Sequence, residues 1–158
     1  KIHMFDVNIS KAENYKESRI FTNGEKIVTA KLPWGQLGMS ICYDLRFPTL
    51  YRKLCLKGAN MISIPAAFTR PTGKSHWRTL IRARAIENLS FVFAPAQCGI
   101  NSSKRKTYGH SMIVSPWGEI IAEMKGNPGF ITAKIDISDV LKVRKMIPSY
   151  KVTSIEKK

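Results

Sequence analysis

Short apolar runs alternate with amphipathic segments through the middle of the chain. Three runs are short and mostly apolar, as buried strands are: residues 37–42, 61–64 and 91–96. Two segments between them repeat apolar side chains at helical spacing, residues 49–59 and 76–88. Ser75 precedes the second of these and is a candidate N-cap. The alternation of strands and helices predicts an α/β layered domain with a mixed sheet.

The two ends of the chain are more polar. Residues 2–7 and 26–32 predict strands, and the polar stretch 8–26 between them predicts a long surface loop. A second polar and basic loop is expected at residues 98–108. Three strands in a meander and a final helix should follow, at residues 111–114, 119–123, 130–135 and 138–146.

The buried strands need a cover on both faces of their sheet. Only two amphipathic helices precede the terminal one, and they are enough for one face. We expect the other face to pack on a partner sheet from residues outside this sequence, or on a second copy in a dimer. The first residue is Lys1 and not Met, so we also expect residues that precede it.

The chain is basic, with 26 Lys and Arg against 11 Asp and Glu among 158 residues, a formal net charge of +15. Such an excess can indicate nucleic-acid binding. The basic residues are spread along the chain, however, and the densest cluster is only residues 104–106. No nucleic-acid-binding motif accompanies them, so we predict a solvated basic surface and no specific nucleic-acid partner.

Other classes of partner are also disfavoured. No apolar run approaches the roughly 20 residues that cross a bilayer, so no membrane partner is predicted. The three cysteines, Cys42, Cys55 and Cys98, form no CxxC pair, which favours a reducing, cytoplasmic setting over a disulfide framework. No spacing typical of metal ligands is present, and neither a metal nor an organic cofactor is predicted.

The most distinctive stretch leads to Cys42. An apolar strand ends at this thiol, a turn with Asp44 and Arg46 follows, and a helical pattern begins at Thr49. A side chain at such a junction is lifted out of the sheet near a helix N-terminus, where the dipole and free N–H groups favour a thiolate. Cys42 is therefore a candidate nucleophile. The local pattern is equally compatible with a buried free cysteine that packs as a small apolar residue.

Several motifs together resemble those of the nitrilase, or carbon–nitrogen hydrolase, superfamily, and they occur in that family's order. They are KIHMFD at 1–6, GMSICYDLRFP at 38–48, PAAF at 65–68, TGKSHW at 72–77, RARAIEN at 82–88, AQCG at 96–99 and YGHSMIVSPWG at 108–118. The resemblance covers nearly all of the chain up to about Pro148. The AQCG and YGHS stretches look most like the Nit branch and, within it, the deaminated glutathione amidases.

The resemblance implies an αββα sandwich of which residues 1–148 form the C-terminal portion, followed by a basic tail at 149–158. It also implies a Glu–Lys–Cys catalytic set. Cys42 matches the nucleophile, Lys1 matches the catalytic lysine, and Glu17 stands where the Nit branch has a supporting glutamate. The general-base glutamate of the family lies upstream of the lysine, so no residue of this sequence matches it. Alone, the chain is expected to be inactive or nearly so.

Further residues near these motifs have candidate roles. The backbone N–H of Tyr43 is a candidate oxyanion donor beside the Lys1 ammonium. Asp44 and Arg46 follow the nucleophile, and we favour a structural role for them in holding its turn. Candidate substrate contacts lie after the strand at 61–64, namely Phe68, Thr69 and His76, although His76 is equally suited to opening its helix.

These inferences predict an amidase. It would cleave a primary amide of a small, carboxylate-bearing substrate to acid and ammonia through a cysteine thioester, as a deaminated glutathione amidase-like enzyme, and would form at least a dimer when complete. An ω-amidase or a carbamoyl hydrolase of the same superfamily is an alternative within the family. A non-catalytic remnant of a split gene, or a basic interaction module, is the alternative from another class.

Overall fold

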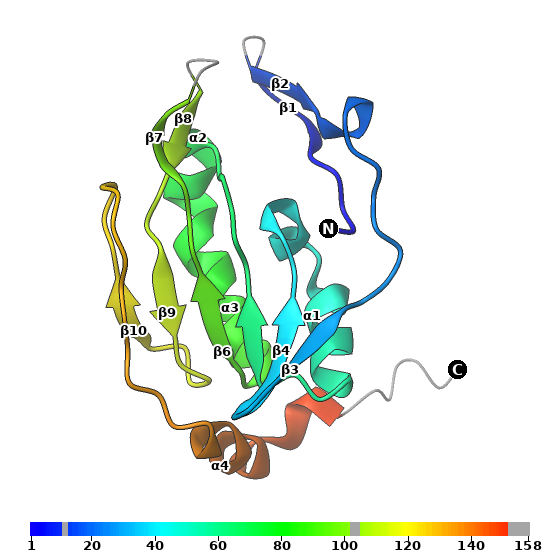
Figure 1. Cartoon of the computed structure of the whole chain (residues 1–158), viewed down its shortest axis with the longest axis vertical. Helices are drawn as coiled ribbons and strands as arrows, with labels where there is room; N and C mark the ends of the chain where they lie inside the picture. Colours follow the sequence, from blue (N-terminus) through cyan, green and yellow to red (C-terminus); the bar gives the residue numbers. More distant parts are fainter. Residues whose placement is uncertain (11–12, 102–104, 152–158) are drawn as a thin grey trace.

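The computed structural model describes residues 1–10, 13–101 and 105–151, and a six-stranded mixed sheet forms its centre. Figure 1 shows the strands side by side in the order β10 (Ile120–Glu123), β9 (Met112–Val114), β6 (Phe91–Ala94), β5 (Met61–Ser63), β4 (Gly35–Met39) and β3 (Thr29–Leu32). The central strands β4, β5 and β6 are parallel, and the outer pairs are antiparallel. The predicted α/β layering with a mixed sheet is therefore confirmed.

The two connections between the parallel strands are helical and lie on the same face of the sheet (Figure 1). Helix α1 (Pro48–Leu56) joins β4 to β5. A longer helical stretch joins β5 to β6 and consists of α2 (Arg70–Thr72), the π-helical turn η3 (Gly73–Trp77) and α3 (Arg78–Asn88). Leu54 and Ile81 from these helices are fully buried in one cluster with Ile62 and Val92 from the strands.

This helical stretch begins earlier than the sequence predicts. It starts at Arg70, with Pro71 in its first turn, where the missing N–H of proline costs no hydrogen bond. Ser75 consequently lies inside the helix, and the N-cap assigned to it is wrong. The last helix, α4 (Ser138–Met146), has the predicted bounds.

The opposite face of the sheet is covered at one end only. Successive strand residues point to opposite faces, so Met61 and Phe91 turn away from α1 and α3, and they pack with Val140 of α4. Towards the sheet edges on this face, Met39 is 49% exposed and Ile121 is 41% exposed. The expectation that further cover comes from outside this chain stays a prediction.

Two hairpins stand where the sequence predicts loops. In place of the loop predicted at 8–26, β1 (Asp6–Ser10), which begins within the strand predicted at 2–7, pairs with β2 (Glu13–Lys16), and the 3-10 turn η1 (Glu17–Arg19) follows. Within residues 98–108, β7 (Cys98–Ile100) pairs with β8 (Lys106–Tyr108). Figure 1 shows both hairpins beyond the same end of the sheet. Their polar composition hides strands that pair mainly with each other, with one further bridge from Thr107 of β8 to Thr69.

Other predicted strands differ in extent. The first begins at Asp6, because the N–H groups of Ile2 and His3 bind a side chain, Asp44, and not a neighbouring strand. The strand predicted at 37–42 ends at Met39. Residues 130–135 form no strand, and Phe130 is 85% exposed.

The C-terminal tail is described only at its start. Residues Pro148–Lys151 form the 3-10 turn η4, whereas 152–158, like residue 104 of the basic cluster, lie outside the described residues. Within the part of the chain that the structure describes, no helix has the length and apolar character of a membrane span.

Candidate active site

The backbone around Cys42 explains how its side chain leaves the sheet. After β4 the chain stays extended, since the N–H of Ser40 binds the Ser63 carbonyl at 3.1 Å and that of Cys42 binds the Pro65 carbonyl at 2.9 Å. At Cys42 the chain turns into the 3-10 helix η2 (Cys42–Arg46) with φ of +51°. A residue with a side chain adopts this left-handed conformation at a cost of about 1–3 kcal/mol, and such strain concentrates at functional sites.

A cavity of about 820 Å³ opens at the carboxyl ends of the parallel strands, the edge where α/β sheets bind ligands. Its floor includes residues 65–67, which follow β5, and 95–97, which follow β6. The structure brings three of the predicted site residues to its wall: Lys1, Glu17 and Cys42. They come from the N-terminal segment, the start of η1 and the start of η2, so only the tertiary fold unites them.

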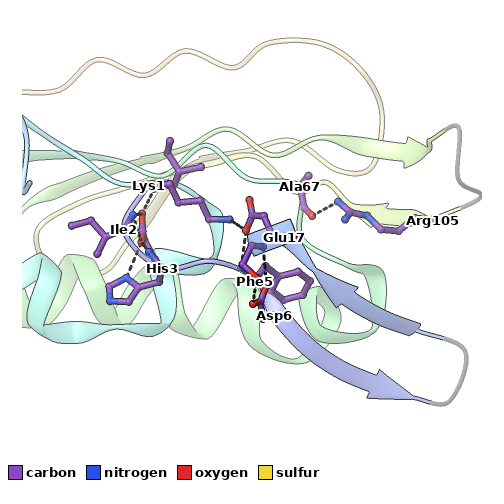
Figure 2. Close-up of polar contacts among 11 residues, drawn as sticks. Lys1, Ile2, His3, Phe5, Asp6, Glu17, Ala67 and Arg105 are labelled. Carbon is purple, nitrogen blue, oxygen red and sulfur yellow. Dashed lines mark hydrogen bonds and ion pairs between the residues drawn. The ribbon is translucent and has the colours of Figure 1, made fainter. Parts of the chain in front are cut away.

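Lys1 and Glu17 form an ion pair in the wall of this cavity (Figure 2). The same Glu17 oxygen accepts a hydrogen bond of 2.6 Å from the backbone N–H of Phe5. The side chains of Lys1 and Glu17 are only 12% and 24% exposed, so water screens the pair weakly. Glu17 thereby holds the ammonium of Lys1 at the cavity.

Asp44 ties the N-terminal segment to the nucleophile turn. Its carboxylate, 1% exposed, accepts hydrogen bonds from the backbone N–H groups of Ile2 at 3.2 Å, His3 at 2.8 Å and Ile41 at 2.9 Å. The His3 ring reaches the same carboxylate through Nδ1 at 2.8 Å, as seen at the left of Figure 2, and stacks on Phe47. One buried side chain therefore fixes where Lys1 stands relative to Cys42.

Burial raises the pKa of the Cys42 thiol above its ordinary value. A backbone hydrogen bond from Ala67 and the positive charge of Lys1 lower this pKa, but burial is the largest influence. Any preference for the thiolate from the predicted helix N-terminus is thus opposed by burial, and the role of Cys42 as nucleophile stays a prediction. In this environment the thiol needs a proton acceptor before it attacks.

Other predicted residues pack around the turn. The Tyr43 ring lies edge-on to Phe5 and Phe47, with centroids 5.1 and 5.4 Å away. The guanidinium of Arg46 lies over the Phe68 ring at 5.2 Å, and its Nη1 is 3.3 Å from Nδ1 of His76.

The three candidate substrate contacts, Phe68, Thr69 and His76, are not among the described residues that line the cavity. Phe68 is 5% exposed and packs on Trp77, and the hydroxyl of Thr69 lies 2.7 Å from that of Thr72. His76 lies beside Arg46. Their role in substrate binding stays a prediction.

The sequence motifs did not single out several residues of the cavity wall. Phe5 and Tyr15 supply aromatic surface, Gln97 an amide, and Arg105 a cation. The segment 97–109 was recognisable as a loop near the motifs, but nothing local marked Arg105 within a run of basic residues. Among the residues that the structure describes, no group of three or more His, Cys, Asp or Glu side chains is placed to hold a metal ion.

The fold and the cavity define an α/β protein with a half-buried thiol that shares a cavity with a lysine–glutamate pair. Residues 1–145 match the family described as carbon-nitrogen hydrolase, and the chain belongs to that family. The predicted superfamily is thus confirmed, and so is the α/β fold class, because solved structures of the superfamily superpose on this chain.

Individual relatives are similar over nearly the whole chain. A deaminated glutathione amidase of Synechocystis is 47% identical over 151 residues, 94% of this chain and 56% of its own. The crystal structure of the Caenorhabditis elegans NitFhit protein is 42% identical with a TM-score of 0.91, over 100% of this chain and 39% of that one. A variant of an amidase from Nesterenkonia, with the acetamide moiety of fluoroacetamide covalently added at its active-site cysteine, is 27% identical with a TM-score of 0.69, over 82% of this chain and 49% of that one.

The chain spans about half the length of the curated relatives it matches. The similarity therefore establishes the family of this sequence. It does not by itself establish the activity of the whole protein.

Proposed function

We propose that the protein containing this chain hydrolyses an amide of a small, carboxylate-bearing molecule through a thioester at Cys42. The observation that carries the proposal is the placement of the Cys42 thiol and the Lys1–Glu17 pair in the wall of one cavity, at the carboxyl edge of the parallel strands. The similarity to an amidase modified at its active-site cysteine supports the role of Cys42.

The reaction would proceed in two halves. The Cys42 sulfur attacks the amide carbon while its proton passes to a base, and the carbonyl oxygen becomes an oxyanion. The Lys1 ammonium and the backbone N–H of Tyr43 are the candidate donors for that oxyanion. The C–N bond then breaks, the leaving nitrogen takes the proton, and a thioester remains. Water adds to the thioester with the base as acceptor, which releases the acid and restores the thiol.

The raised pKa of Cys42 makes the base essential to this scheme. Glu17 is occupied by the Lys1 ammonium and the Phe5 N–H, which suits it to holding the lysine and leaves little capacity for proton transfer. We assign the base to the glutamate that the family has upstream of its lysine, outside the sequence given. A general base typically contributes about 10²–10⁴-fold to the rate.

The relatives named deaminated glutathione amidase make an amide derived from glutathione the first substrate to test. A primary amide would release ammonia, whereas the peptide-like amides of glutathione would release an amine, so the assay should detect both products. An ω-amidase activity on 2-oxo-acid amides and a carbamoyl hydrolase activity remain the alternatives within the family. A complete enzyme is proposed to act as a homo-oligomer in the cytoplasm.

The test uses the protein expressed from its complete gene. Deaminated glutathione and 2-oxoglutaramate are supplied separately, and acid, amine and ammonia are followed by mass spectrometry. Cys42→Ala should reduce product formation to background, whereas Cys98→Ala, outside the cavity lining, should leave it within a few-fold. Turnover that persists in Cys42→Ala would refute the thioester route, and a wild-type protein without turnover would favour the non-catalytic remnant.

A further inference from the structure

Arg105 is a cation of the cavity wall that the chemistry above does not use. It lies directly before β8, on the hairpin opposite the Lys1–Glu17 pair, and it lines the same cavity as Cys42. Figure 2 shows its guanidinium directed at Ala67, whose carbonyl accepts a hydrogen bond of 3.0 Å from Nη2. The guanidinium also lies 5.4 Å from the centroid of the Tyr15 ring.

The guanidinium is held in place, but not all of its hydrogen-bond donors have an acceptor. Its Nε is buried and has no hydrogen-bond partner among the described residues. No carboxylate of the described chain lies within ion-pair distance of it. Glu17, the carboxylate that shares the cavity wall, is paired with Lys1. Arg105 as a whole is half-buried, so its buried Nε without an acceptor and its charge without a counter-charge carry a cost that an anionic ligand in the cavity would reduce.

The position of Arg105 relative to the sulfur sets the size of such a ligand. Ala67 hydrogen-bonds Cys42 through its backbone N–H and accepts from Arg105 through its carbonyl, so one residue separates the two side chains. The charge of Arg105 is also close enough to lower the pKa of Cys42. A group bound to Arg105 would therefore stand only a few atoms from a carbon attacked by Cys42.

We propose that Arg105 binds the distal carboxylate of the substrate, so that the cavity selects monoamides of short dicarboxylic acids over neutral amides of equal length. This inference rests on the proposed function and names the residue that would give it specificity. The planar, two-pronged guanidinium matches a carboxylate better than an ammonium does. Lys1 and Tyr43 are left to the oxyanion, and Arg105 to the other end of the molecule.

The experiment compares glutaramate, the monoamide of glutaric acid, with pentanamide, which has the same chain length and no carboxylate. The protein from the complete gene is assayed as wild type and with Arg105→Gln, Arg105→Lys and Lys106→Gln. Lys106 is the matched control, because it is the next residue, is exposed and lies outside the cavity lining. Arg105→Gln should raise the KM for glutaramate about 10- to 100-fold, the value of a hydrogen bond to a charged group.

The neutral substrate separates recognition from structure. The preference, measured as the ratio of kcat/KM for glutaramate to that for pentanamide, should be high in the wild type and should fall about 10- to 100-fold in Arg105→Gln, because the loss of the Arg105 charge beside Cys42 affects both substrates alike. Arg105→Lys should retain part of this preference, and Lys106→Gln should retain all of it. An equal loss of both activities in Arg105→Gln would overturn the inference, since Arg105 would then only support the Ala67 loop. Should Arg105→Gln fail to fold, loss of the whole preference in a folded Arg105→Lys would also overturn it.

A second readout needs no turnover. Glutarate should slow the alkylation of Cys42 by iodoacetamide in the wild type and in Lys106→Gln, as followed by the mass of the Cys42 peptide, and should protect Arg105→Gln at least tenfold more weakly. A wild type that shows this protection but hydrolyses neither of these amides, nor deaminated glutathione, nor 2-oxoglutaramate, would refute the proposed function and support carboxylate binding by Arg105. Equal protection of wild type and Arg105→Gln would refute the inference whatever the activity.

Discussion

Replacing Asp44 with asparagine tests whether one carboxylate holds Lys1 in register with Cys42. The side chain keeps its size, but one acceptor oxygen becomes an amide group that donates. If that group replaces Oδ2, it faces the N–H of Ile41; if it replaces Oδ1, it faces the N–H of His3. In either orientation at least one buried N–H group loses its acceptor, and the remaining hydrogen bonds lose their negative charge.

The magnitude follows from these contacts. An unsatisfied buried donor costs about 1–3 kcal/mol, and hydrogen bonds to a charged group exceed neutral ones by about 1 kcal/mol. We therefore expect Asp44→Asn to lower the free energy of unfolding by about 2–4 kcal/mol. The loss should extend to catalysis, because Ile2 and His3 adjoin Lys1 and the ammonium would no longer be fixed beside the thiol.

Urea denaturation of the protein from its complete gene measures this difference. Asp139→Asn is the matched control, with the same chemical change at an exposed carboxylate that pairs with Lys142 at 2.8 Å, and it should cost less than about 1 kcal/mol. If the two variants unfold within about 1 kcal/mol of each other, the assignment of Asp44 as the tie between the two segments is wrong.

Two further outcomes are expected. Because burial raises the pKa of Cys42, its alkylation by iodoacetamide in the absence of substrate should be slower at pH 7.5 than that of free cysteine. It should still increase above about pH 9.5, where the alkylation of free cysteine, with a pKa of about 8.5, levels off; a plateau below about pH 8 would contradict this. Gly73→Ala would place a Cβ 2.4 Å from the Cβ of Tyr108 and should lower the free energy of unfolding by about 1–3 kcal/mol in urea denaturation. The added Cβ of the control Gly126→Ala meets nothing within 4 Å and should be tolerated, so equal stabilities of the two variants would show that the helix and β8 separate easily.

The local sequence pattern was sufficient to predict the elements whose side chains are buried along most of their length. The strands β5 and β6 and the helix α1 were predicted close to their observed bounds, because the strands are continuous apolar runs and the helix repeats its apolar side chains at helical spacing. The same reasoning failed at residues 130–135, which are apolar in part but form no strand pairing in the structure, and Phe130 is exposed. A strand needs a partner, and a partner is a property of the tertiary fold.

The residues of the candidate site also differ in whether the local sequence could reveal them. Cys42 could be singled out from its own surroundings, whereas Lys1 and Glu17 emerged only through the resemblance to a family. Two of the partners of Asp44, the N–H groups of Ile2 and His3, lie 42 and 41 positions away and are backbone groups, which carry no residue-specific signal. Arg105 becomes a candidate only because its Nε is buried in the folded structure without a hydrogen-bond partner among the described residues. Contacts of this kind are fixed by three-dimensional packing and leave no local trace.

The left-handed backbone at Cys42 has a consequence for engineering. Three residues with side chains adopt this conformation in the described chain, Cys42, Leu89 and His110, and glycine would fit each of them with less strain. A thermostabilisation campaign that ranks positions by backbone compatibility would select all three. At Leu89, which ends α3, such a replacement would also remove a leucine side chain that is buried in the core, so the relief of backbone strain would be opposed by lost packing. At Cys42 such a replacement would remove the thiol. A gain in folding stability at this position would therefore cost the proposed reaction its nucleophile.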